Sequence, residues 1–313
     1  MRHATVYEYG GDVAHSHHLL HLTPRDFEFQ RCLRHSLELD PEPSSAWDDF
    51  DAFGNAIARL EYDRPHDRLS VTAEMEVEIL PRGASPLDTS DPCEAVRHRL
   101  SYHAAAVAAA DLDAIGYRMQ SSHVRIKQDF GDYAADCLRP DRAIASACEA
   151  LMHKIHREFD YVPGSTTNRT SITEVLASRR GVCQDFAHVM IGCLRSCGLS
   201  ARYVSGYIRA ARAAPEHAQV ARREAAHAVA AAADDEATGP ASGDASHAWV
   251  SVYCPPLGWI DFDPTNDCLV GEDHVTLAWG RDFGDVSPLR GMIVGGGRHE
   301  LSVDVRVQLL NGA

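Results

Sequence analysis

The sequence predicts an α+β protein in which a β-rich N-terminal region precedes a mixed region of helices and strands. Apolar and polar residues alternate over most of residues 1 to about 80, and apolar residues recur every three or four positions between 93 and 159. Alternation then returns in the C-terminal part, at 247–254, 258–264 and 301–310. A chain of 313 residues has room for one or two domains.

The β-rich region contains five alternating stretches, which Pro41, Pro43 and Gly54-Asn55 help to separate. The stretches are 4–11, 18–24, 30–41, 55–63 and 69–80. Their number and spacing are typical of an antiparallel sheet or sandwich. We therefore predict a β-rich domain over residues 1–90, followed by a second domain over residues 91–313.

The second domain is predicted to begin with helices. Residues 93–112 and 141–160 carry apolar side chains at helical spacing. Further on, Ser171 and Glu174 form a capping-box pattern that predicts a short helix running to about Arg179. Gly181 then allows a break before the next helix.

The segment from about 209 to 246 interrupts these patterns. Sixteen of its 38 residues are alanine, and Val220 and Val229 are its only larger aliphatic residues. A segment of this composition cannot build a core. We expect a surface insertion, for which a lid role is the alternative.

Composition excludes several classes of function. The net charge of −15 opposes binding to a nucleic-acid backbone, and no apolar run reaches the roughly 20 residues of a membrane span. The first residues lack the apolar core of a secretory signal. Nine cysteines, an odd number without paired spacing, favour reduced thiols and a cytoplasmic location.

Four histidines near the N-terminus form the one pattern that suggests a metal: His15, His17, His18 and His21. On a strand, His18 would face away from the other three. We therefore predict no metal site here, and no metal or other cofactor elsewhere in the chain.

Cys183 is the strongest candidate for chemistry. It precedes an apolar face formed at helical spacing by Phe186, Val189 and Met190, so it falls in the first turn of a buried helix. Unpaired backbone N–H groups and the positive end of the helix dipole favour a thiolate there.

A proton partner is available in the predicted hairpin of residues 247–254 and 258–264. His247 begins the first strand and Asp263 ends the second, within a few residues of facing positions. A carboxylate that orients the imidazole, with the thiol of Cys183 on its other side, would complete a Cys-His-Asp triad. Asp261 faces the same side of its strand and is the alternative carboxylate.

Three ordered blocks then resemble the bacterial transglutaminase-like superfamily. They are TSITEVLASRRGVCQDFAHVMIGCLRSCGLSARYVSGY (170–207), SHAWVSVY (246–253) and GWIDFDPTND (258–267). The resemblance implies a papain-like transglutaminase core, with a helix-borne cysteine packed on an antiparallel sheet. It implies Cys183 as nucleophile, His247 as base and Asp263 as the orienting carboxylate.

The remainder of the chain also resembles proteins of this superfamily. The N-terminal motifs Pro24-Arg25, Gln30, Asp40-Pro41, Phe53-Gly54-Asn55 and Pro65-His66 resemble the bacterial transglutaminase-like N-terminal region. GRDFGDVSPLRG (280–291) and GGGRHELSVDV (295–305) resemble the usual C-terminal portion.

The expected function is a cysteine-dependent amide-bond enzyme that works through a thioester, and a protease or amidase is favoured. The alternatives are a protein-glutamine transglutaminase, which transfers the acyl group to an amine, and a silent binding or scaffold module. The expected partner is a peptide or protein amide substrate, with no nucleic acid and no membrane.

Four further residues have two interpretations each. His188 is interpreted as a packed core histidine rather than a catalytic one. Tyr161, Trp249 and Trp259 could line the cleft, although packing explains them equally well.

Overall fold

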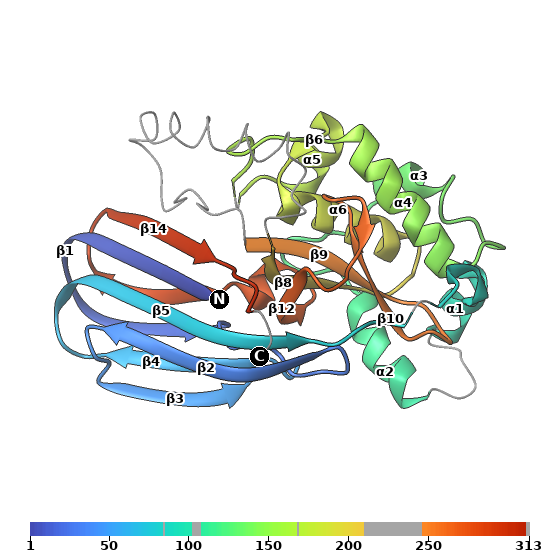
Figure 1. Cartoon of the computed structure of the whole chain (residues 1–313). Helices are drawn as coiled ribbons and strands as arrows, with labels where there is room; N and C mark the ends of the chain where they lie inside the picture. The colour runs from blue at the N-terminus through green and yellow to red at the C-terminus, as the bar shows by residue number, and fades with distance from the viewer. Residues whose placement is uncertain (84, 102–107, 168, 210–245, 311–313) are drawn as a thin grey trace.

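The computed structural model describes residues 1–313 except 84, 102–107, 168, 210–245 and 311–313. Figure 1 shows a long β-sheet on one side of the molecule and a second sheet covered by helices on the other. The predicted α+β class is confirmed, with a β-rich N-terminal region and a mixed core. None of the helices in the described part of the chain combines the length and the apolarity that a membrane span requires.

The N-terminal sheet is built around one long strand, β1 (Arg2–Leu20). Residues 2–8 of β1 pair with both β5 and β14, and residues 16–20 pair with both β4 and β13. The other strands of this sheet are β2 (Gln30–Asp40), β3 (Ser45–Phe50), β4 (Ala56–Tyr62), β5 (His66–Ile79), β13 (Leu289–Gly295) and β14 (His299–Arg306).

The separation of residues 4–11 from 18–24 into two strands was wrong, because Gly10 and Gly11 do not form a turn. Their backbone N–H groups donate to the carbonyls of Arg298 and Gly296, at 2.7 and 3.1 Å. The C-terminal hairpin therefore satisfies the backbone where a turn would have begun, and β1 continues through the glycines.

Two strands from the C-terminal part of the chain thus belong to the N-terminal sheet. Both β13 and β14 pair antiparallel with β1. The domain boundary at residue 90 stays a prediction. The pairing shows that residues 289–306 are hydrogen-bonded to the sheet on the N-terminal side of that boundary.

The core sheet has five strands in the order β11-β10-β9-β8-β12. They are β8 (Ala201–Ile208), β9 (Ser246–Tyr253), β10 (Trp259–Asp263), β11 (Cys268–Leu269) and β12 (His274–Gly280). Strands β9 and β10 form the predicted hairpin, whose turn is closed by hydrogen bonds between Cys254 and both Leu257 and Gly258. All eight residues of β8 are buried, as expected for a central strand.

Helices cover this sheet. They are α1 (Cys93–Arg99), α2 (Ala109–Ile115), α3 (Gln128–Ala134), α4 (Ile144–Glu158), α5 (Ile172–Ser178), α6 (Cys183–Ser196) and α8 (Phe283–Val286), with 3₁₀ turns at Leu87–Thr89 and Gly116–Arg118. The helical pattern predicted over 93–112 contains α1 and the start of α2, and residues 102–107 between them lie outside the described residues. Most of the alanine-rich insertion, 210–245, also lies outside them.

Two buried amides join the sheets by binding the backbone of β12. The Gln30 side chain donates to the Thr276 carbonyl at 2.8 Å and accepts from the Thr276 N–H at 2.7 Å. Asn55 makes the same pair of bonds with Trp279, at 2.8 and 3.0 Å. These side chains satisfy backbone groups of β12, which is the edge strand of the core sheet, and they fix the core sheet against the N-terminal one.

Candidate active site

Cys183 is the first residue of α6, as predicted, and its side chain is half-buried. The segment before it is fixed by α5, where Ser171 and Glu174 form the predicted capping box. Arg179 ends α5 in the left-handed conformation, with φ of 57°. The short strand β7 (Arg180–Gly181) then pairs with β6 (Asp160–Tyr161) and leads directly into the cysteine.

Asp185 holds the first turn of α6 in place. Its Oδ2 accepts from the Val182 backbone N–H at 2.9 Å and from the Thr166 hydroxyl at 2.6 Å. A Cβ on Gly181 would lie 2.8 Å from the Cβ of Asp185, so only glycine allows this close approach. Burial raises the pKa of Asp185, although both hydrogen bonds act in the opposite direction. The residue thus positions the helix end that carries Cys183.

His247 and Asp263 are brought together by the β9–β10 hairpin. His247 Nε2 lies 2.7 Å from Asp263 Oδ2, and both side chains are buried. The register pairs Phe262 with Val250, which puts Asp263 two residues from the position facing His247. Both side chains project from the same face, so the diagonal spacing allows them to meet.

The Asp263 carboxylate is fully buried and has several partners. Besides His247, its Oδ2 receives Asn266 Nδ2 at 2.7 Å and lies 3.2 Å from His274 Nε2. Its Oδ1 accepts from the backbone N–H groups of Thr265 and Asn266 at 3.0 and 3.1 Å. Burial alone would raise the pKa of Asp263, but the two histidines hold it well below its usual range. The carboxylate is therefore ionised and fixed in orientation.

The other side of the His247 ring faces Cys183. Burial lowers the pKa of His247, but the Asp263 charge, the hydrogen bond to Asp263 and a side-chain hydrogen bond to Cys183 together raise it to about 10. Because Nε2 is directed at Asp263, Nδ1 is the nitrogen left for the sulfur. The arrangement favours a charged imidazolium between a carboxylate and a thiol at neutral pH.

His274 and Asn266 were missed by the sequence prediction. Asn266 stands three residues after Asp263, and an Asp-Pro-Thr-Asn turn of this kind was a usable signal because such side chains bond locally. His274 comes from β12, two strands away from β9 in the sheet. His274 and Asp263 lie on different strands, so no helix or strand periodicity relates them and the sequence pattern could not identify His274 as a partner.

The alternative residues have other partners. Asp261 accepts a hydrogen bond from Arg82 at 2.9 Å, whereas the carboxylate that contacts His247 is that of Asp263. His188 is buried, stacks on His123 and accepts from the Phe283 N–H at 3.2 Å; burial lowers its pKa to about 3. It is a neutral packed residue, as interpreted from the sequence.

The three aromatic candidates are explained by packing contacts. Trp249 is fully buried, with its ring 5.4 Å from that of His274. Trp259 packs under the guanidinium of Arg202, 3.5 Å from the ring centroid. Tyr161 contacts Phe186 edge to face. Of the three aromatic residues, Tyr161 lies next to the segment that leads into Cys183, because it pairs with Gly181.

Comparison with known proteins gives the family. Residues 1–78 match the bacterial transglutaminase-like N-terminal region and residues 131–264 match the transglutaminase-like superfamily. The "Uncharacterized protein Rv2569c" of Mycobacterium tuberculosis is 34% identical over 318 residues, covering 97% of this chain and 90% of the relative. The chain belongs to the transglutaminase-like superfamily. The "Uncharacterized protein ML0607" of Mycobacterium leprae is 29% identical, covering 98% of this chain and 97% of the relative.

A solved structure shares the fold of this transglutaminase-like protein. It is a crystal structure from Cytophaga hutchinsonii described as a "Putative Cysteine Protease", with a TM-score of 0.65 and 18% identity. The match covers 99% of this chain and 91% of that one. The predicted papain-like transglutaminase core is confirmed, and membership of the superfamily supports a cysteine-dependent enzyme.

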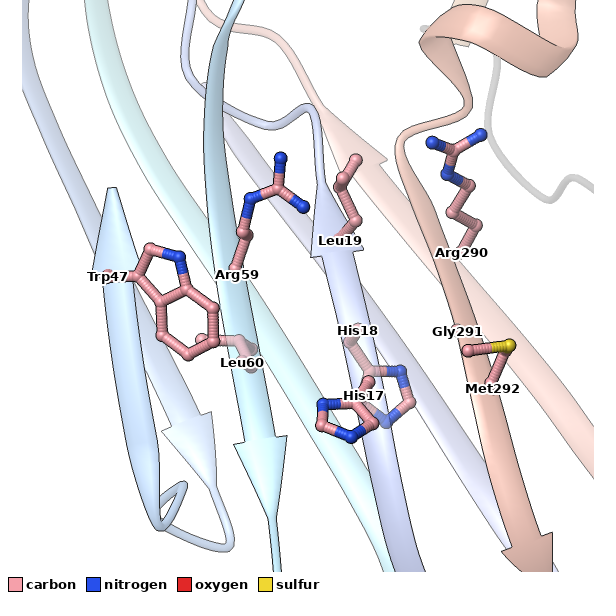
Figure 2. Close-up of a pocket in the computed structure, with 9 residues that line it drawn as sticks. All are labelled: His17, His18, Leu19, Trp47, Arg59, Leu60, Arg290, Gly291 and Met292. Atoms are coloured by element: carbon pink, nitrogen blue, oxygen red, sulfur yellow. The ribbon is translucent and has the colours of Figure 1, made fainter. Parts of the chain in front are cut away.

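Two places in the described residues could offer three ligand atoms to a metal ion. His247, Asp263 and His274 form one, but there the carboxylate is already occupied by five hydrogen-bonding groups. His15, His17 and Glu61 form the other, on the N-terminal sheet. A shallow hollow of about 310 Å³ lies beside this second group (Figure 2). Its lining residues include His17, Trp47, Arg59, Arg290 and Met292.

Proposed function

We propose that this transglutaminase-like protein hydrolyses amide bonds through a thioester formed on Cys183. The observation that carries the proposal is the 2.7 Å contact between His247 Nε2 and Asp263 Oδ2, together with Cys183, whose side chain contributes to the raised pKa of the same imidazole. A sulfur nucleophile, an imidazole with a raised pKa and an orienting carboxylate are the three groups that this chemistry requires.

In the first half of the reaction the Cys183 thiolate attacks the carbonyl carbon of the amide. The developing oxyanion is stabilised by backbone N–H groups at the start of α6, with that of Cys183 the nearest. The His247 imidazolium gives its proton to the leaving nitrogen as the C–N bond breaks. A thioester on Cys183, a neutral His247 and a free amine result.

In the second half neutral His247 takes a proton from water, which attacks the thioester carbonyl. The C–S bond breaks, the carboxylic acid product leaves, and the thiolate–imidazolium pair is restored. If a primary amine attacks instead of water, the same site is a transglutaminase. We favour water because it is always present at high concentration.

The proposal is tested by the pH dependence of alkylation. We expect iodoacetamide to modify Cys183 faster than Cys32 at pH 6 and pH 7, because the His247 imidazolium stabilises the attacking thiolate. In His247→Ala the rate should fall steeply below pH 8. Half-buried Cys32, whose pKa burial raises, is the internal reference in the same digest. If Cys183 follows the same profile as Cys32, the ion pair does not exist.

The choice between water and amine needs a substrate assay. Glutamine-containing casein is incubated with the protein, with and without a fluorescent primary amine, and Cys183→Ala is the control. Release of new amino termini or of ammonia without amine incorporation supports a hydrolase. Incorporation of the amine supports a transglutaminase, and equal turnover by Cys183→Ala would exclude both.

We also propose that the protein functions in a reducing compartment such as the cytoplasm. In support, all nine cysteines are free thiols.

A further inference from the structure

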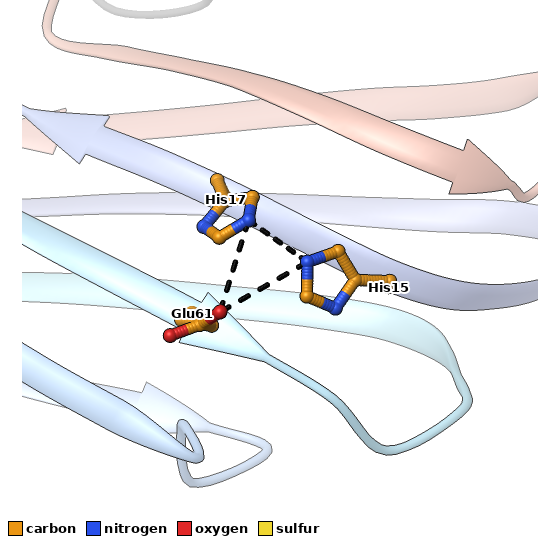
Figure 3. Close-up of side chains that lie close together, drawn as sticks. All are labelled: His15, His17 and Glu61. Carbon is orange, nitrogen blue, oxygen red and sulfur yellow. Dashed lines mark hydrogen bonds and ion pairs between the residues drawn. The ribbon is translucent and has the colours of Figure 1, made fainter.

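Three side chains from two neighbouring strands converge on the outer face of the N-terminal sheet (Figure 3). His15 and His17 are two residues apart on β1, so they project from the same face. The antiparallel register places Glu61 of β4 directly opposite His17. Asp63 follows two positions later and lies beside His15. The sheet thus brings two imidazoles and a carboxylate together, which the spacing of the histidines alone did not reveal.

The distances match those between the ligands of a small metal ion. His15 Nε2 lies 2.8 Å from His17 Nε2, and Glu61 Oε1 lies 4.0 and 3.8 Å from these two nitrogens. The point equidistant from the three atoms is about 2.1 Å from each, which is the usual length of a zinc–nitrogen or zinc–oxygen bond. Because this point lies in the plane of the three atoms, a tetrahedral ion would require the two imidazole nitrogens to move apart from their 2.8 Å separation, which rotation of these exposed side chains allows.

A fourth residue, Asp63, orients His15 for metal binding. His15 Nδ1 lies 2.8 Å from Asp63 Oδ1, so the Nδ1 proton is held by that carboxylate and the Nε2 lone pair is left free. A carboxylate on the far nitrogen of a histidine is the usual outer partner of a zinc ligand. To bind an ion through Nε2, the neutral ring of His17 must likewise carry its proton on Nδ1. Because Nε2 of His17 is hydrogen-bonded to Nε2 of His15 in the structure, metal binding requires His17 to change its tautomer.

The surrounding charges permit a cation. Glu61 and Asp63 supply two negative charges, and the basic group nearest along β4, Arg59, is directed to Asp49 at 3.6 Å. His15 and His17 are 38% and 46% exposed, which allows an ion to enter and leaves a position for water. Two imidazoles and one carboxylate with an open fourth position form a ligand set typical of Zn²⁺.

We propose that this face of the sheet is a zinc site, in which His15 Nε2, His17 Nε2 and Glu61 Oε1 bind the ion and Asp63 orients His15. The ion would join β1 to β4. The site is separate from Cys183 and does not depend on the proposed enzyme activity.

Metal binding is measured on the full chain, first alkylated with iodoacetamide so that accessible thiols do not compete. Zn²⁺ is titrated calorimetrically, and Co²⁺ is titrated by its visible absorption, which also reports any sulfur ligand through charge-transfer bands. We expect one ion per chain and no sulfur bands. The double variant His15→Gln/His17→Gln should lose at least about 100-fold in affinity, since it retains one of three ligands.

Single variants give the finer test. Glu61→Gln should bind at least about tenfold more weakly, and Asp63→Asn about 10- to 100-fold more weakly, because an outer carboxylate contributes that much to metal affinity. The matched control is His98→Gln, an exposed histidine of α1 outside the cluster, which should bind as the wild type does. Circular dichroism in EDTA confirms that each variant is folded.

The results decide the proposal. One ion per chain that is lost in the double variant and kept in His98→Gln supports the site. Equal binding by the wild type and the double variant, or no stoichiometric binding by the wild type, overturns it.

Discussion

His274 Nε2 lies 3.2 Å from Asp263 Oδ2, the same oxygen that is bonded to His247. His274 is completely buried and comes from β12, while the other two residues come from the β9–β10 hairpin. The Asp263 carboxylate is therefore held both by the β9–β10 hairpin and by β12. A rotation of Asp263 away from His247 would break the bond to His274 as well.

We predict that His274 positions Asp263 for its role beside His247. In His274→Leu, iodoacetamide should modify Cys183 more slowly at pH 6, because a less firmly held Asp263 stabilises the His247 imidazolium less, and the imidazolium in turn stabilises the Cys183 thiolate less. At pH 9, where the thiol ionises without help, the rate should be unchanged. His274→Gln keeps a hydrogen-bond donor and should restore the rate at pH 6. A uniform loss at both pH values would instead indicate a general structural defect.

The pKa of His247 predicts how stability depends on pH. It is raised to about 10 in the fold from an ordinary value of 6.5, so the protonated ring stabilises the fold fully below pH 6.5. This contribution should decline as pH rises from 6.5 to 10, by at most about 1.4 kcal/mol per pH unit. Urea unfolding of the wild type and His247→Gln should therefore give a difference in unfolding free energy that narrows over this range. A constant or widening difference would show that His247 is not held as the cation.

Gly206 of β8 is predicted to tolerate no side chain. A Cβ there would lie 2.1 Å from the Val275 carbonyl oxygen and 2.5 Å from the indole ring of Trp249. The Val275 carbonyl belongs to the backbone and the Trp249 ring is fully buried, so moving either would cost considerable free energy. We expect Gly206→Ala to lower the unfolding free energy by about 3 kcal/mol. Gly271→Ala, where a Cβ meets nothing within 4 Å, is the control and should change it by less than about 0.5 kcal/mol.

Arg195 of α6 joins the helix to three other segments. Its buried guanidinium donates to the carbonyls of Tyr117, Ala201 and Arg281 and to the Ser121 hydroxyl. Arg195→Met would leave these acceptors unpaired in the interior, so we expect a loss of at least about 3 kcal/mol in unfolding free energy. Denaturant unfolding should show no comparable loss in Arg306→Met, whose side chain is 68% exposed. Similar losses in both variants would contradict this account.

Local patterns in the sequence predicted much of the candidate site. The capping box at Ser171 and Glu174, the start of a helix at Cys183 and the hairpin that carries His247 and Asp263 depend on neighbouring residues only, and the structure contains all three. The catalytic roles of Cys183, His247 and Asp263 remain a prediction that the alkylation experiment tests.

The features that the sequence did not reveal depend on contacts between distant segments. His274 reaches Asp263 because β12 lies in the same sheet, and Glu61 reaches His17 because of the register between β1 and β4. Gly10 and Gly11 signal a turn when read alone, and only their bonds to the 296–298 segment keep β1 extended. Strand register and sheet order are not encoded in local periodicity, which explains these omissions.

The pairing of β1 with β13 and β14 has a consequence for how the chain folds as it is synthesised. Each half of β1 has two neighbours, and one neighbour of each half is made more than 260 residues after it. Until then, one edge of each half of this 19-residue strand lacks its final partner and presents unpaired backbone groups. The N-terminal sheet can therefore close only after residues 289–306 have been synthesised. Pairing between segments so far apart in sequence is expected to be a slow step of folding.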